Sequence, residues 1–252
     1  MKPDSTDEAQ MLARIAHRLG RQASDESHRT WNPAPSLPER TPVLPVETLA
    51  ARFLVELVRL GGRGLRAQTE AEAVDYVLSV MTGAEARAAL GAGPHAAGPV
   101  LLWDDPLLSR LGLASALSAH GLEVAVWNPE AGPEALKALA AQAPFGITSA
   151  AWGVAETGSI ALPAGSGQGR LVSLLPPTHI ALLPEERLLP SLAELFRTLA
   201  RENRGTDGRG GRALPSSLAL TTGPSRSADI ENDLSIGVHG PAEVHVVLLP
   251  AV

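Results

Sequence analysis

The sequence predicts an α/β fold, namely an open mixed, mainly parallel sheet with flanking helices, preceded by an N-terminal helical arm. Between residues 99 and 150, short apolar runs alternate with amphipathic segments, which is typical of parallel strands joined by right-handed helical crossovers. The chain has 252 residues, of which 44% are hydrophobic, so it can bury the core of one main domain. A proline-rich stretch separates this domain from the first helix.

The N-terminal region is predicted to form a helix followed by an extended arm. Ser5 and Glu8 have the spacing of a capping box, and apolar residues recur at helical intervals through residues 6–19. The remainder of this region holds five prolines and few clustered apolar residues, which favours an extended conformation. The predicted domains are therefore the arm, 1–45, and the main domain, 46–252.

Periodic patterns predict the helices and strands at the start of the main domain. Two helices come first, at 46–60 and 69–81, and Thr69 with Glu72 caps the second. Strands and helices then alternate. The predicted elements are a strand at 99–104, a helix at 106–119, a strand at 123–128, a helix at 133–141 and a strand at 145–150.

The second half of the domain is predicted to interrupt this parallel pattern. The apolar segments 159–163 and 170–175 are joined by the glycine-rich AGSGQG, which indicates a hairpin and a locally mixed sheet. Ser191 with Glu194 caps a later helix. The other predicted elements are strands at 178–184 and 217–222, a helix from about residue 225 and a last strand at 243–249.

Composition excludes several classes of function. With 21 basic and 27 acidic residues the net charge is −6, and no basic run offers the positive surface that a nucleic-acid partner needs. No apolar stretch approaches the roughly 18 to 20 residues of a membrane span, and the first residues are acidic rather than signal-like. We therefore expect a cytoplasmic protein with no membrane span.

The absence of cysteine limits the redox chemistry of this chain. Without cysteine there are no disulfides, no thiol nucleophiles and none of the usual ligands of iron–sulfur clusters, so any such cluster would lie on another chain. His239 and His245 lack a local third ligand and the spacing of a zinc motif, so no metal site is predicted.

The glycine clusters do not predict a nucleotide-binding loop. Residues 91–98 precede a predicted strand and residues 165–169 join two strands, so neither has the strand–turn–helix context of a dinucleotide fingerprint. A Gly-x-Ser-x-Gly elbow is also missing, which leaves serine hydrolase chemistry with little support.

The stretch TTGPSRSADIE predicts an anion-binding crevice. Gly223 ends a strand and a helix is expected from Ser225, so free N–H groups and the positive end of a dipole would lie at the carboxyl edge of the sheet. Arg226 adds a positive charge. The alternative is an ordinary helix start in which Ser225 or Ser227 is the cap and Asp229 complements the dipole.

Two other turns supply candidate site residues. His239 and Gly240 lie in a tight turn before the last strand, where the imidazole either faces the same crevice or is simply exposed. Glu156 lies beside Thr157 and Gly158 in a turn between apolar segments. Its carboxylate is either a solvated loop acid or, if partly desolvated, a base or nucleophile.

The segment RLVSLLPPTHIALLP adds Arg170, Thr178 and His179, with a double proline that stiffens the approach to the strand. Taken singly, the arginine is more simply an exposed residue and the histidine a core-edge residue. From the residues alone, the prediction is an α/β domain with a ligand crevice.

Three longer blocks carry a family resemblance. GITSAAWGVAETGSIAL, SLLPPTHIALL and TGPSRSADIENDLSIGVHGPAEVHVVLL resemble the LUD-domain family, and within it the lactate-utilization C group, in order and near their usual spacing over 46–252. The matched positions are the turn 156–158, the segment 177–179, the turn 223–229 and the turn 239–241.

The resemblance implies a fold similar to sugar-phosphate isomerases and CoA-transferases and a role in the oxidation of L-lactate to pyruvate. It implies a non-redox subunit that binds no cofactor itself, with iron–sulfur clusters on electron-transfer partner subunits, rather than a catalyst acting alone. Two alternatives remain. One is a stand-alone transferase or ligase that binds an acyl-CoA, folate-like or sugar-phosphate ligand, with Glu156 as the reacting carboxylate. The other is a regulatory or partner-binding module that docks through its N-terminal helix.

Overall fold

The computed structural model describes residues 5–18, 44–83, 98–204, 215–228 and 234–250. It divides into two compact units, residues 1–39 and residues 40–252. The smaller unit contains helix α1 (Ser5–Arg18), which confirms the predicted first helix. The predicted domain boundary at residue 45 stays a prediction.

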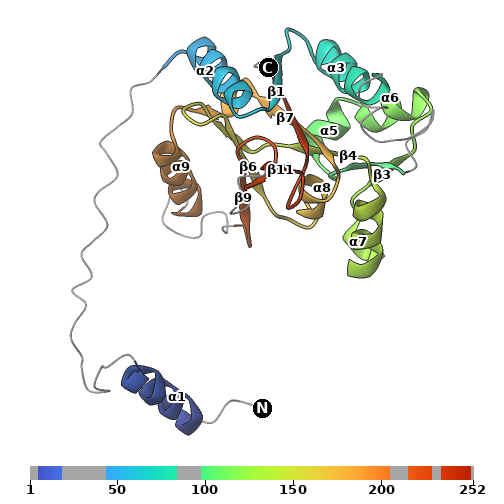
Figure 1. Ribbon diagram of the computed structural model, residues 1–252. Coiled ribbons are helices and arrows are strands. Elements are labelled where there is room, and N and C mark those ends of the chain that lie inside the picture. The colour runs from blue at the N-terminus through green and yellow to red at the C-terminus, as the bar shows by residue number, and fades with distance from the viewer. Residues whose placement is uncertain (1–4, 19–43, 84–97, 205–214, 229–233, 251–252) are drawn as a thin grey trace. The chain divides into compact units, whose positions relative to one another are not determined.

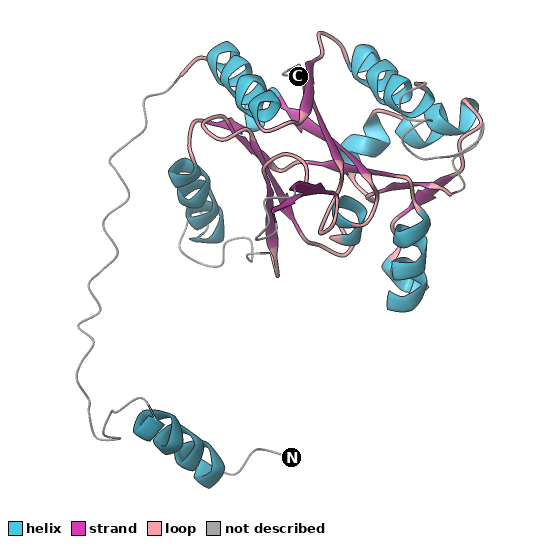
Figure 2. Ribbon diagram, in the orientation of Figure 1, coloured by secondary structure: helices cyan, strands magenta, loops and turns pink. Residues whose placement is uncertain are grey.

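The larger unit is built on a six-stranded sheet in which every pair of neighbouring strands is parallel (Figures 1 and 2). Its two central strands are buried along nearly their whole length, as expected for a parallel sheet covered on both faces. The predicted α/β class is therefore confirmed. In spatial order the strands are β1 (Arg63–Arg66), β12 (Glu243–Leu249), β7 (Thr178–Pro184), β4 (Phe145–Ser149), β2 (Val100–Leu102) and β3 (Val124–Val126).

Helices cover both faces of this sheet. Gly146 of β4 faces the short helix α8 so closely that a Cβ atom there would collide with the Val172 carbonyl oxygen. On the opposite face, the Tyr76 hydroxyl of α3 lies 2.9 Å from Nδ1 of His245. The helices of this unit are α2 (Val46–Arg59), α3 (Glu70–Thr82), α5 (Pro106–Arg110), α6 (Leu113–Ala119), α7 (Pro133–Gln142), α8 (Leu171–Leu174) and α9 (Leu192–Arg204), with 3-10 turns η1 (Pro129–Ala131) and η2 (Glu185–Arg187).

A second, four-stranded sheet carries the mixed pairing that the sequence predicts. Strand β6 pairs antiparallel with both of its neighbours, and β5 pairs parallel with β8. Trp152 and Val154 of β5 pack with Leu195 and Leu199 of α9 in a separate small core. The strand order is β8 (Leu188–Leu189), β5 (Trp152–Val154), β6 (Ser159–Pro163) and β9 (Leu218–Thr221).

The predicted strand at 170–175 is wrong, because this segment contains helix α8. The hairpin that includes β6 is formed with β5 before it, through the turn at residues 155–158. Val172 and Ser173 of α8 are buried. Packing over Gly146 therefore outweighs the strand tendency of this apolar run.

The helix predicted from residue 225 is also wrong. Strands β10 (Arg226–Ala228) and β11 (Leu234–Ile236) form an antiparallel pair there, with Ser227 opposite Ser235. Asp229 lies outside the described residues. At the other end of the pair, the Gly237 N–H donates to the Ser225 carbonyl at 3.0 Å, which closes a ladder rather than a helical turn.

Two smaller differences concern element boundaries. Strand β1 lies between α2 and α3, whereas the sequence predicts no strand there, because its RGLR sequence has only one large apolar residue. The single helix predicted at 106–119 is two helices, since Gly112 between them has φ 63°, a left-handed value that interrupts the helix.

Candidate ligand-binding site

A pocket of about 590 Å³ lies where strands β2 and β4 end. The chain runs from β2 to β3 on one side and then crosses to β4 on the other side of β2. Ligands of open α/β sheets bind at such a topological switch point, outside the carboxyl ends of the strands. The position and the size of the pocket both favour a ligand site.

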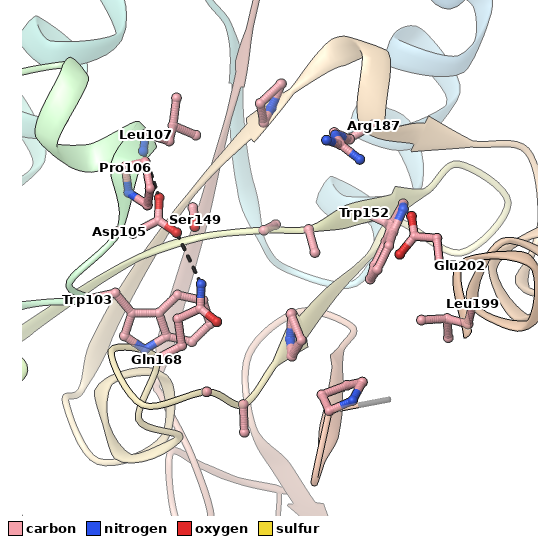
Figure 3. Close-up of a pocket in the computed structure, with 17 residues that line it drawn as sticks. Trp103, Asp105, Pro106, Leu107, Ser149, Trp152, Gln168, Arg187, Leu199 and Glu202 are labelled. Carbon is pink, nitrogen blue, oxygen red and sulfur yellow. Dashed lines mark hydrogen bonds between the residues drawn. The ribbon is translucent and has the colours of Figure 1, made fainter. Parts of the chain in front are cut away.

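One wall of the pocket is prearranged by hydrogen bonds between the end of β2 and the glycine-rich loop (Figure 3). Trp103 Nε1 donates to the Gly169 carbonyl at 2.9 Å. Asp105 is 7% exposed, and its Oδ1 accepts from the Leu107 N–H at 2.9 Å, which caps α5. Its Oδ2 accepts from Gln168 Nε2 at 3.2 Å. The glycine-rich loop is therefore a pocket wall and not a hairpin turn.

The facing wall combines an aromatic ring with two charged side chains. Trp152 begins β5, Leu199 and Glu202 come from α9, and Arg187 ends η2. Figure 3 shows Arg187 and Glu202 beside Trp152, across the pocket from Asp105 and Gln168. Within the described ranges, the Arg187 guanidinium forms no hydrogen bond or ion pair.

None of the predicted site residues that the structure describes lines this pocket. Most of them instead meet beside the C-terminal half of α2. Gly158, with φ 62°, approaches α2 so closely that a Cβ would collide with the Leu57 backbone nitrogen. Thr157 Oγ1 lies 2.8 Å from Ser159 Oγ, which lies 2.7 Å from Thr222 Oγ1. A chain of hydroxyl groups thus connects two of the predicted turns.

The third predicted turn joins this group through Ser225. Its Oγ accepts from the His239 N–H at 3.3 Å, and Gly240 lies against its Cβ. Arg226 is exposed, and its guanidinium lies against Gly61, directly after α2. The sequence therefore brings together Gly158, Gly223, Ser225, Arg226 and His239 in space, but not at the pocket.

The helix dipole proposed for the anion-binding crevice is absent, because β10 occupies the segment after Ser225. Arg226 instead lies at the C-terminal end of α2, where the partial negative charge of the carbonyl groups favours a cation. Ligand binding by Ser225, Arg226 and Ser227 stays a prediction without that support.

Glu156 is half-buried in the turn between β5 and β6 and has a structural partner. Its Oε1 accepts from the Leu192 N–H at 2.7 Å, at the first residue of α9. This hydrogen bond satisfies one of the free N–H groups at the start of that helix. A reacting role for Glu156 stays a prediction.

His179 is fully buried near the amino end of β7, away from the pocket edge. Its Nε2 lies 2.9 Å from Thr148 Oγ1, whereas Nδ1 has no hydrogen-bond partner. Burial, and secondarily the nearby His245, lowers the pKa of His179 to about 3, so the ring is neutral near pH 7. Thr178 beside it is also buried, and Arg170 is exposed before α8.

His245 is a second buried histidine on β12. Burial lowers its pKa, although a hydrogen bond to Glu243 opposes this change. Among the described residues, no cluster of three or more histidine, aspartate or glutamate side chains has the arrangement of a metal site. In the same residues, no helix has the length and apolar character needed to cross a membrane.

The sequence analysis missed Trp103, Asp105 and Arg187 as site residues. Trp103 and Asp105 follow the strand PVLL, so a search of strand ends would have found them. The signal that selects this strand end is the switch between β3 and β4, which becomes visible only when the strand order is known.

Comparisons with known proteins come from sequence and from structure. The LUD domain family model matches residues 50–249. A protein of Geobacillus kaustophilus called "Lactate utilization protein C" is 32% identical over 246 residues, 94% of each chain. One of the same name from Halalkalibacterium halodurans is 41% identical over 147 residues, which cover 58% of this chain and 60% of that relative. A crystal structure of a DUF162 family protein from Deinococcus radiodurans is 21% identical, with a TM-score of 0.48, and covers 82% of this chain and 99% of that one.

Proposed function

Because this chain belongs to the LUD domain family, we propose that it acts in lactate utilization, as a non-redox subunit of a complex that oxidises L-lactate to pyruvate. One observation carries the proposal. The Geobacillus kaustophilus protein named for lactate utilization aligns with 94% of this chain and over 94% of its own length. A match of that extent includes more than one shared motif.

The division of labour within the complex follows from the chemistry of lactate oxidation. Converting the hydroxyl carbon of lactate to a ketone releases two electrons and two protons, and an acceptor has to take the electrons. Iron–sulfur clusters are held by cysteine thiolates, and this chain has no cysteine among its 252 residues. We therefore assign the clusters to partner subunits and ligand binding to this chain.

Gene deletion in the native host tests the role in lactate utilization. Loss of the gene should abolish growth on L-lactate while leaving growth on glucose unchanged, and the intact gene on a plasmid should restore it. The matched control is a plasmid copy with an early stop codon. Normal growth of the deletion strain on L-lactate would contradict the proposed role.

A separate assay tests the non-redox assignment. The purified chain, mixed with L-lactate and an artificial dye acceptor, should not reduce the dye, because it carries no group that passes electrons on. Dye reduction by the purified chain alone would overturn that assignment, whatever the growth experiment shows.

A further inference from the structure

The pocket at the ends of β2 and β4 is too large for the proposed substrate of the complex. Its volume of about 590 Å³ falls in the range of roughly 300–1,000 Å³ that holds drug-sized ligands and cofactors. A three-carbon acid such as lactate would fill a small part of it and leave the rest to water. The matching ligand is of the size of a mononucleotide.

Aromatic rings face the pocket from both walls. Trp103 follows β2 and Trp152 begins β5, and Figure 3 shows them on opposite sides of the space. The Trp103 ring is held by its hydrogen bond to Gly169, so it does not need to reorganise when a ligand enters. Fixed indole rings favour a flat aromatic partner, which stacks against them or meets them edge to face.

Charge gives the pocket a direction. Asp105 has both carboxylate oxygens in use and orients Gln168, whose Oε1 is left to accept a hydrogen bond from a ligand. Across the pocket, Arg187 has no ion partner within the described ranges, and a guanidinium binds phosphate or carboxylate through paired N–H groups. Glu202, near Trp152, disfavours a second anionic group on that wall and accepts from a ring N–H.

We infer that this pocket binds a ligand of mononucleotide size in which a planar heteroaromatic ring with N–H donors carries an anionic group. The ring lies between the tryptophans, towards Gln168, and the anionic group lies at Arg187. The inference goes beyond the proposed function, since it concerns what this chain binds by itself, without partner subunits.

Isothermal titration calorimetry on the purified full chain tests the inference, with flavin mononucleotide, adenosine monophosphate and L-lactate as probes. At least one of the two nucleotides should bind, and L-lactate should not. Riboflavin or adenosine, the matching compound without phosphate, should bind at least tenfold more weakly, because the contact with Arg187 is lost.

Arg187→Gln should weaken the nucleotide at least tenfold, and the same change at the exposed Arg52 of α2, outside the pocket, should have no effect. The inference is overturned if neither nucleotide binds, if removing the phosphate leaves the affinity unchanged, or if Arg187→Gln binds as the parent chain does. Thermal unfolding of each variant shows whether it is folded. Should Arg187→Gln not fold, the comparison with and without phosphate on the parent chain decides.

Discussion

A single buried histidine ties the stability of this fold to pH. The ring of His179 is fully buried and has a pKa of about 3, well below the value of roughly 6.5 for an exposed histidine. Between these two pH values the unfolded chain binds a proton at this position and the folded chain does not. The free energy of unfolding therefore falls as the pH decreases from about 6.5 towards 3.

Replacing His179 by glutamine should remove this contribution, because an amide does not titrate and can still bond to Thr148. Below pH 6.5 the parent chain should lose about 1.4 kcal/mol per pH unit more than the variant. Urea unfolding at pH 7, 6, 5 and 4, followed by circular dichroism, measures the difference. The exposed His120 provides the control, and His120→Gln should keep the slope of the parent chain. Equal slopes for His179→Gln and the parent chain would contradict the interpretation.

Individual residues also show where sequence reasoning reached its limit. The turn at Glu156 and its partial burial were predictable from the apolar segments around it. Its partner, the Leu192 N–H, belongs to a helix far along the chain, so no local pattern indicates that hydrogen bond. The same holds for Arg226, whose neighbour Gly61 lies after α2. Side-chain partners distant in sequence depend on packing that a single sequence does not display.

At the scale of elements, the contact between the β5–β6 turn and α2 requires a residue without a side chain. Gly158 has φ 62° and lies against the backbone of Leu57. Gly158→Ala should therefore lower the free energy of unfolding by about 3 kcal/mol, from the left-handed backbone and the collision together. Gly121 has φ 75° with open space around its Cβ position, so Gly121→Ala should lower it by about 1 kcal/mol.

Urea unfolding of the two glycine variants separates these effects, because the backbone conformation is shared and only the neighbour differs. Equal losses for Gly158→Ala and Gly121→Ala would mean that α2 moves aside at no cost, and that the close approach does not constrain the turn.

Elements with strong local signals were the ones that the sequence predicted. Helix α3 follows its capping residue Thr69, whose Oγ1 accepts from the Glu72 N–H at 3.1 Å, and the central strands are continuous apolar runs. Strand β1 was missed because an edge strand needs little apolar sequence. Strands β10 and β11 were missed because serine and glycine at a strand end resemble a helix start, and their pairing partners decide between the two.

At the scale of the whole molecule, residues 40–252 have their own core and form a unit of their own. Deleting residues 1–39 should therefore leave the unfolding temperature of the remainder within about 2 °C of the full chain. Thermal unfolding of both chains by circular dichroism makes the comparison. A markedly lower temperature for the shortened chain would show that the first unit contributes to the stability of the second.

The class of the fold was predictable, whereas its strand order was not. Alternating apolar runs imply parallel strands, and right-handed crossovers limit their arrangement. They do not say that β4 returns to the other side of β2, which is what creates the switch point and the pocket there. The predicted site was therefore drawn from motifs, which the fold gathers beside α2 instead.

Strand β12 lies between β1 and β7, so the first strand of the sheet pairs with the last one made. During synthesis, β1 has no partner and β7 keeps an apolar edge open until Glu243–Leu249 has left the ribosome. Unpaired strand edges of this kind attract other chains and chaperones. The strand order thus makes the nascent domain dependent on protection for most of its translation, and folding of the sheet becomes a late, post-release event.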